Sequence, residues 1–216
     1  MSAERKSLLK DDSGAALLEF TAGAFTFFIV LFGIVEFSNV YYQWNAATKA
    51  TQLGARLAAV SEPAVVGFRD ISGLSDDVLP GGTMPDFDFT CVDGTSGCST
   101  DALRTIVYGR CDPATETCVN GVRTACNFAS HPRNVGMCNV FPRVNAPSMI
   151  SVRYENTSLG YAGRPGGPVP TITVSLRQLN YDFILLGAFL PTNSITMPSF
   201  ATTVTGEDLN ASWSSS

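Results

Sequence analysis

The longest hydrophobic stretch of the chain lies near its N-terminus. Residues 20–35 contain no charged side chain and consist mainly of Phe, Ile, Leu, Val, Ala and Gly. A helix over residues 15–40 would be about 39 Å long at about 1.5 Å per residue, which is enough to cross a hydrocarbon core of about 30 Å. The pattern therefore predicts one transmembrane helix, with the carboxylate of Glu19 at the start of its apolar run.

The helical period continues beyond the apolar run as far as residue 60. Mostly small residues recur there at helical spacing, which would allow close packing on the chain's own domain, the simpler interpretation, or on a helix of another subunit. The packing residues that we expect in this stripe are Trp44, Ala47, Gly54 and Ala58. Pro63 should end the helix at Glu62, because proline disfavours helical geometry in the residue before it.

The remainder of the chain alternates between short strands and turns. Strand-like patterns cover residues 87–92, 149–154, 171–179 and 195–204, with Gly- and Pro-rich segments between them. Residues 181–190 are apolar and aromatic, but they are too few for a second membrane span. This order predicts an α+β fold in which a long N-terminal transmembrane helix continues into a small antiparallel β-sheet domain.

Six cysteines are gathered in the loop-rich region 86–145. They are Cys91, Cys98, Cys111, Cys118, Cys126 and Cys138. An even number behind a membrane segment indicates disulfide bonds in an oxidising compartment, whereas reduced thiols in a cytosolic domain are the alternative. We expect each cysteine to pair with its nearest neighbour, which would staple these loops. A zinc site is disfavoured, because no C-x-x-C pair occurs and His131 is the only histidine.

The charge distribution orients the chain and excludes one class of partner. Only 15% of the residues are charged and the net charge is −5, which argues against a nucleic acid as a partner. Arg5, Lys6 and Lys10 precede the apolar run, and no Lys or Arg follows it before Lys49. Basic residues mark the cytoplasmic side of a span. The N-terminus is therefore predicted inside and residues 45–216 outside the cytoplasm.

Two features fall at the predicted outer edge of the span. Tyr41, Tyr42 and Trp44 would form an aromatic belt at the membrane interface. Glu36 lies shortly before them, and we interpret it as an interfacial charge.

The sequence contains no recognisable catalytic motif. G-x-S-x-G, P-loop and H-E-x-x-H patterns are all absent, and we expect no catalytic residue, no metal and no cofactor. Asp112, Glu116 and Asn120 lie close together, but they lack the EF-hand spacing, so a solvated turn is preferred to a calcium loop. The sequence therefore favours a structural or binding protein over an enzyme.

The start of the apolar run resembles the processing site of type IV prepilins. Residues 14–20 read GAALLEF, and the resemblance implies that a prepilin peptidase cleaves after Gly14 on the cytoplasmic side. Ala15 would then be the first residue of the mature chain, with Glu19 four positions further on. Phe20 stands where the Flp-type branch of the family usually has an aromatic residue.

Further matches resemble the TadE-like pseudopilins of tight-adherence (Tad) pilus systems. They are GIVEF at 33–37, GAR at 54–56, YG at 108–109 and ITV at 172–174. The resemblance implies a pilin-like plan, with a leader at 1–14, the transmembrane and extended helix at 15–62 and a periplasmic sheet domain at 63–216. It also implies a minor pseudopilin of the bacterial inner membrane that acts as a structural and assembly subunit of a Tad-type pilus, a system of cell adhesion, and associates through its N-terminal helix. Its partners would be other pilin subunits, Tad assembly proteins and prepilin peptidase.

Glu19 has two interpretations. A carboxylate beside lipid is costly if it is unpaired, and the resemblance implies that Glu19 pairs with the Ala15 amine of a neighbouring subunit and sets the register of assembly. Alternatively, Glu19 complements the dipole at the start of its own helix. A different function also stays open, namely an uncleaved single-pass anchor that bears a periplasmic binding domain, such as an adhesin or a sensor.

Overall fold

Two compact units make up the chain. The computed structural model describes residues 13–113, 118–119, 121–127, 134–185, 187 and 193–206. The first unit comprises Met1–Tyr42 and Tyr181–Ile195, and the second comprises Gln43–Asn180 and Thr196–Ser216. The long N-terminal helix begins in the first unit and ends in the second.

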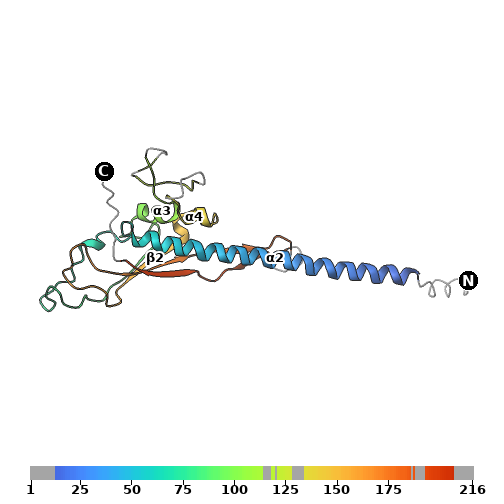
Figure 1. Cartoon of the computed structure of the whole chain (residues 1–216), viewed down its shortest axis with the longest axis horizontal. Coiled ribbons are helices and arrows are strands. Elements are labelled where there is room, and N and C mark those ends of the chain that lie inside the picture. Colours follow the sequence, from blue (N-terminus) through green and yellow to red (C-terminus); the bar gives the residue numbers. More distant parts are fainter. Residues whose placement is uncertain are drawn as a thin grey trace, which may run out of the picture. The chain divides into compact units, whose positions relative to one another are not determined.

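The N-terminal helix α2 is one continuous element, Ser13–Ala59, drawn as the long blue-to-cyan ribbon of Figure 1. Among the described residues, it is the one helix that is long and apolar enough to cross a membrane. The prediction of a long N-terminal helix is therefore confirmed, although the helix ends before Glu62. The backbone tightens at this end, because the Val60 amide donates a hydrogen bond to the Leu57 carbonyl at 3.3 Å.

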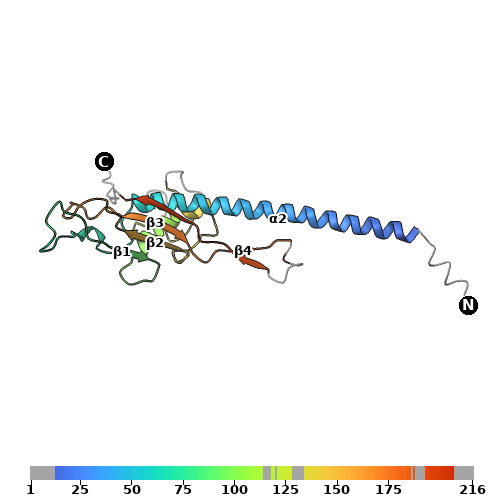
Figure 2. The same cartoon turned by 90° about the horizontal axis from the view of Figure 1, so that it is seen from below.

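Four antiparallel strands form the main sheet, in the order β1-β2-β3-β6. Figure 2 shows the first three side by side. The predicted α+β fold, a long helix with a small antiparallel sheet, is confirmed. Strands β4 and β5 form a separate two-stranded sheet. The bounds are β1 (Asp88–Cys91), β2 (Ile150–Glu155), β3 (Thr171–Leu176), β4 (Asn180–Asp182), β5 (Ser194–Thr196) and β6 (Ala201–Thr205).

One predicted strand is divided in the structure. The sequence predicts a strand over residues 195–204, but β5 ends at Thr196 and β6 begins at Ala201. Pro198 lies between them, and proline has no amide hydrogen to donate to a strand ladder. The division lets β5 pair with β4 while β6 pairs with β3 in the main sheet.

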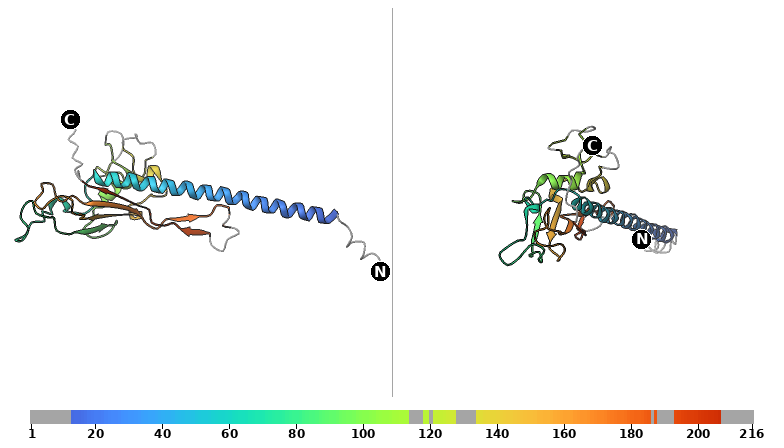
Figure 3. Two further views of the ribbon diagram at one scale, coloured as in Figure 1. Left: turned by 60° about the horizontal axis from the view of Figure 1, so that its bottom comes forward. Right: turned by 60° about the vertical axis from the view of Figure 1, so that its left-hand side comes forward.

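One face of the main sheet forms the core of the second unit. The C-terminal part of α2 packs beside this sheet, as both views of Figure 3 show. The Thr202 hydroxyl of β6 donates a hydrogen bond of 3.0 Å to the Thr51 hydroxyl of α2. Side chains alternate along β2 and β3. The buried set is Ile150, Val152, Tyr154, Ile172, Val174 and Leu176.

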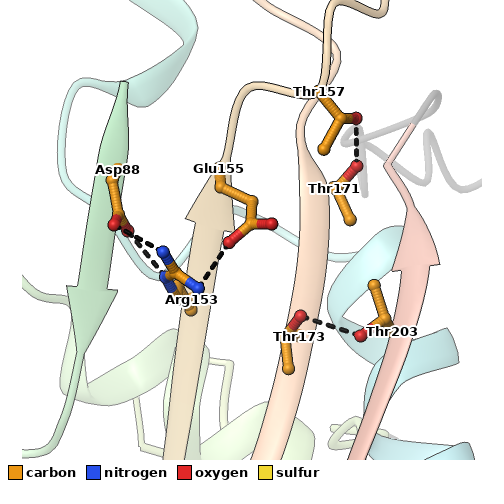
Figure 4. A network of polar contacts seen from close by, with 7 residues as sticks. All are labelled: Asp88, Arg153, Glu155, Thr157, Thr171, Thr173 and Thr203. Carbon is orange, nitrogen blue, oxygen red and sulfur yellow. Dashed lines mark hydrogen bonds and ion pairs between the residues drawn. The ribbon is translucent and has the colours of Figure 1, made fainter. Parts of the chain in front are cut away.

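The opposite face of the sheet is polar (Figure 4). Arg153 pairs with Asp88 and with Glu155, and the nitrogen–oxygen distance is 2.6 Å in each pair. The hydrogen bond from Arg153 holds the pKa of Asp88 below its usual value. The hydroxyls of Thr173 and Thr203 lie 2.9 Å apart. Exposed ion pairs contribute little to stability because solvent screens them, so burial of the apolar face is the main contribution that holds the sheet in place.

Short helices and disulfides organise the loops of the second unit. The helices are η1 (Phe68–Asp70), α3 (Thr100–Tyr108), α4 (Met137–Val140) and η2 (Pro147–Met149). Ser99 caps α3, because its side chain accepts a hydrogen bond from the Ala102 amide. The disulfides join neighbouring cysteines, as the sequence suggested. They are Cys91–Cys98, Cys111–Cys118 and Cys126–Cys138.

Tyr154 links the core of the sheet to the segment that follows α2. Its buried hydroxyl accepts a hydrogen bond of 2.9 Å from the Ala64 amide. We expect Tyr154→Phe to lower the free energy of unfolding by about 1–3 kcal/mol at neutral pH, because the buried Ala64 amide loses its acceptor. Chemical unfolding of the detergent-solubilised chain measures the difference, with Tyr161→Phe, at an exposed tyrosine, as the control. Equal stability of the Tyr154→Phe variant and the unaltered chain would contradict this prediction.

The raised pKa of Tyr154 predicts that the folded state loses stability at alkaline pH. Burial raises the pKa of Tyr154 from 10.0 to about 12, although the hydrogen bond from Ala64 opposes the shift. Between these two pH values the unfolded state ionises while the folded state keeps the neutral phenol. The contribution of Tyr154 to the free energy of unfolding is therefore complete below pH 10 and is lost as the pH rises to about 12. In the Tyr154→Phe variant this part of the alkaline loss should be absent from the unfolding curves.

Candidate functional site

The residues predicted to direct processing and assembly lie together at the start of α2. Gly14, Ala15, Glu19 and Phe20 are all exposed, and a methyl group placed on Gly14 would meet no atom within 4 Å. Residues four apart on a helix lie on one face, so Glu19 stands one turn beyond Ala15 on the same side. At this end of the helix, the backbone at Gly14 and the carboxylate of Glu19 are therefore both accessible to another molecule.

The N-terminal part of α2 exposes a continuous set of large apolar side chains. Exposed patches of this kind mark a membrane or protein contact. Within the run, the ring centroids of Phe28 and Phe32 lie 6.1 Å apart, so neighbouring aromatic rings contact one another along the helix. The exposed set includes Leu17, Leu18, Phe20, Phe25, Phe27, Phe28, Ile29, Val30, Leu31, Ile34, Val35 and Phe37. The apolar surface and its position suggest a membrane anchor.

Glu36 is buried, with only 3% of its surface exposed. Its Oε1 accepts hydrogen bonds from the Tyr181 hydroxyl at 2.7 Å and from the Ile184 amide at 2.8 Å. Its Oε2 accepts a third from the Leu185 amide at 2.9 Å. The carboxylate of Glu36 is therefore enclosed by protein donors, a feature that its interpretation as an interfacial charge did not include.

These contacts define the Glu36 cluster, which comprises Glu36, Asn39, Tyr181 and the backbone amides of Ile184 and Leu185. Asn39 extends it by donating from Nδ2 to the Tyr181 hydroxyl at 3.2 Å, and Tyr181 is fully buried. A buried carboxylate is costly unless it is hydrogen-bonded, and bonds to an ionised acceptor are stronger than neutral ones. The cluster thus fixes the segment after β4 to α2.

The sequence holds one signal that could have indicated the Glu36 cluster. A carboxylate among apolar residues near a membrane generally has a partner. Tyr181, the first donor of the segment, is 145 residues away from Glu36. The local sequence of this segment indicates only an apolar and aromatic run. No local spacing connects the two, so the partners follow from the fold alone.

The small-residue stripe of α2 packs on the chain's own domain. Ala47 and Ala58 are fully buried, and the Trp44 ring lies 4.8 Å from the Phe200 ring in an edge-to-face arrangement. A methyl group placed on Gly54 would lie 2.5 Å from the Met137 Sδ atom, so Gly54 allows this close approach. Packing on the own domain, one of the two predicted alternatives, is what the structure shows.

Part of the segment predicted as a solvated turn, for which a calcium loop was the alternative, lies outside the described residues, as does the one histidine. Asp112 is described, whereas Glu116, Asn120 and His131 are not. Within the ranges that the structure describes, no group of three or more His, Cys, Asp or Glu side chains is placed to hold a metal ion.

The buried Arg123 joins two loop segments of the second unit. Its Nη1 donates hydrogen bonds to the carbonyls of Tyr108, at 3.0 Å, and Asn134, at 2.7 Å.

A comparison with protein families bears on the N-terminal helix. Residues 14–56 match the family model described as TadE-like protein. The match begins at Gly14 and contains Glu19 and Glu36, and it ends before the disulfides and the main sheet. No curated protein and no solved structure matches the chain significantly. Residues 14–56 are therefore similar to the TadE-like family, which confirms the resemblance seen in the sequence of this segment.

Proposed function

We propose that the chain is a minor pseudopilin that acts as a structural and assembly subunit of a bacterial Tad-type pilus. The observation that carries the proposal is the coincidence of the TadE-like match, residues 14–56, with a helix whose N-terminal part exposes large apolar side chains. Such a helix can associate laterally with like helices in a membrane. This role requires neither a catalytic residue nor a cofactor.

The proposed topology places the helix in the bacterial inner membrane. Arg5, Lys6 and Lys10 support a cytoplasmic N-terminus. Residues 1–14 would be the leader, residues 15–62 the transmembrane and extended helix, and residues 63–216 the periplasmic domain. The three disulfides fit an oxidising compartment. The partners would be prepilin peptidase, other pilin subunits and Tad assembly proteins.

In the proposed mechanism, cleavage after Gly14 creates a charged amine on Ala15. The exposed Glu19 carboxylate of a neighbouring subunit then pairs with this amine. Opposite charges attract strongly where the dielectric constant is low. The pairing would fix how far one helix enters relative to the next, while the apolar side chains supply the lateral contact.

The experiment that tests the proposal is the intact mass and N-terminal sequence of the protein purified from its native membrane. We expect a chain that begins at Ala15. Gly14→Val should block this cleavage, whereas Gly23→Val is a matched control, because a methyl group placed on either glycine would have no atom within 4 Å. A chain beginning at Met1 in the unaltered protein would contradict the proposal and favour an uncleaved anchor that bears a binding domain.

A further inference from the structure

We infer that the β4–β5 hairpin is a lipid-binding element whose apolar residues lie in the distal leaflet, the membrane leaflet farther from Gly14. The described residues concerned, here termed the hairpin shoulder, are Phe183, Ile184, Leu185 and Ile195. The inference requires α2 to be a membrane anchor. It goes beyond the proposed pilus role, which assigns no function to this hairpin.

The position of the hairpin along α2 places it at the membrane boundary. From Ala15 to Glu36 the helix rises about 32 Å at about 1.5 Å per residue, and a hydrocarbon core is about 30 Å thick. The Glu36 cluster therefore lies near the distal edge of the core. Tyr181 contacts both Asn39 and Glu36, whereas Ile184 and Leu185 contact Glu36.

The hairpin extends from this level along the helix. Figure 3 shows β4 and β5 beside α2, with β4 directed toward the N-terminal end of the helix. Residues 183–185 follow β4 on the side that faces the membrane interior. The hairpin shoulder is thus at the depth where interfacial and acyl regions of a lipid leaflet meet.

The hairpin shoulder is apolar and in part open to the surroundings. Ile184 is 67% exposed and Ile195 is 45% exposed, and Phe183 packs edge-to-face on Tyr181 with ring centroids 5.6 Å apart. The sequence has no charged residue between Asp182 and Glu207. Phe37, next to Glu36 on the helix, is likewise 72% exposed. The hairpin and the helix therefore offer apolar surface at the same level.

The hydrogen bonds of the hairpin satisfy backbone amides that a non-helical segment would otherwise leave unpaired in lipid. Such a segment is normally excluded because its backbone amides lack acceptors there. The Ile184 and Leu185 amides donate to the Glu36 carboxylate, and the Phe183 amide donates to the Asn193 carbonyl at 2.9 Å. The carboxylate is satisfied by the same bonds, so helix and hairpin make one another compatible with an apolar environment.

Phospholipid acyl chains are the occupant that these observations favour. The exposed apolar side chains of the hairpin shoulder belong to the same compact unit as those of α2. Burial of apolar side chains among acyl chains is favourable because it removes apolar surface from water. A water-facing hairpin at this level would forgo that gain.

The test is the depth of a nitroxide label in the full-length protein reconstituted in phosphatidylcholine nanodiscs. A ketone-bearing residue at the labelled position leaves the three disulfides unaltered. The labels stand at Ile184, at Phe37 as a helix reference and at Val66 as a control that is also 67% exposed. We expect oxygen to relax the Ile184 label several-fold more than a water-soluble nickel complex does, as at Phe37, and the reverse preference at Val66.

Each result decides a different part of the inference. An Ile184 label that prefers nickel while the Phe37 label prefers oxygen would overturn lipid binding by the hairpin and leave the anchor intact. Nickel preference of both the Ile184 and the Phe37 labels would contradict membrane anchoring by α2, and with it lipid binding by the hairpin. An Ile184 label shielded from both reagents would show that protein covers the hairpin, which would also overturn the inference. Loss of pilus assembly affects none of these outcomes, because the measurement uses the purified chain.

Discussion

Replacement of Glu36 by alanine is expected to release the β4–β5 hairpin from α2. The Ile184 and Leu185 amides would lose the carboxylate that accepts their hydrogen bonds. The Tyr181 hydroxyl would lose its 2.7 Å bond but keep the 3.5 Å bond to the Glu36 carbonyl. A buried donor that is left without an acceptor costs about 1–3 kcal/mol, so the loss of both amide acceptors costs about 2–6 kcal/mol. We therefore expect the amides of Ile184 and Leu185 to exchange with solvent on the order of 100-fold faster in Glu36→Ala.

Hydrogen exchange of these two amides, followed in the full chain in nanodiscs, measures the effect. Glu36→Gln should have an intermediate effect, because one oxygen remains as an acceptor while the charge is lost. Phe37→Ala is the matched control, since it truncates the exposed neighbour of Glu36 without touching the cluster. Unchanged protection in Glu36→Ala would show that the hairpin is held by contacts other than this carboxylate.

Replacement of Glu19 by alanine is expected to abolish pilus assembly while leaving membrane insertion unchanged. In the proposed mechanism the carboxylate pairs with the Ala15 amine of a neighbouring subunit. The exposed Glu19 has no buried contact to lose, so the fold of the second unit should not be affected. Pili counted on cells should fall to the level seen without the protein, and the amount of chain in the membrane fraction should stay the same.

Glu62→Ala is the acidic control for this experiment. Glu62 forms a partly exposed ion pair with Arg69 at 3.1 Å, and such pairs contribute little to stability. We expect cells with Glu62→Ala to assemble pili normally. Normal pilus numbers in Glu19→Ala would contradict the role in register and support the interpretation in which Glu19 only complements the dipole of its own helix.

The elements that the sequence predicted correctly are those encoded by local patterns. The apolar run and the small-residue stripe specify α2, and the alternation of residues along β2 and β3 specifies a sheet with one buried face. Cysteine spacing suggested the observed pairing because each bond closes a short loop. These features depend on neighbours in sequence, so they could be inferred without the fold.

The features that the sequence did not predict depend on distant contacts. The fold brings Glu36 and Tyr181 together. The sequence of residues 181–190 indicates only an apolar and aromatic segment. The break between β5 and β6 near Pro198 depends on the pairing of β5 with β4, which no local pattern in residues 195–204 specifies. For Gly14 and Glu19, the structure gives their exposure, while their roles rest on the proposed function.

The order of the disulfides along the chain has a consequence for oxidative folding. The paired cysteines are separated by 7, 7 and 12 positions, and no loop encloses or crosses another. Short loops have the lowest entropic cost of closure in an unfolded chain. In the proposed topology, we therefore expect a chain that emerges from the membrane to form the native bonds first, before β6 exists to complete the sheet. We expect oxidation in the order of synthesis to yield the native set without reshuffling.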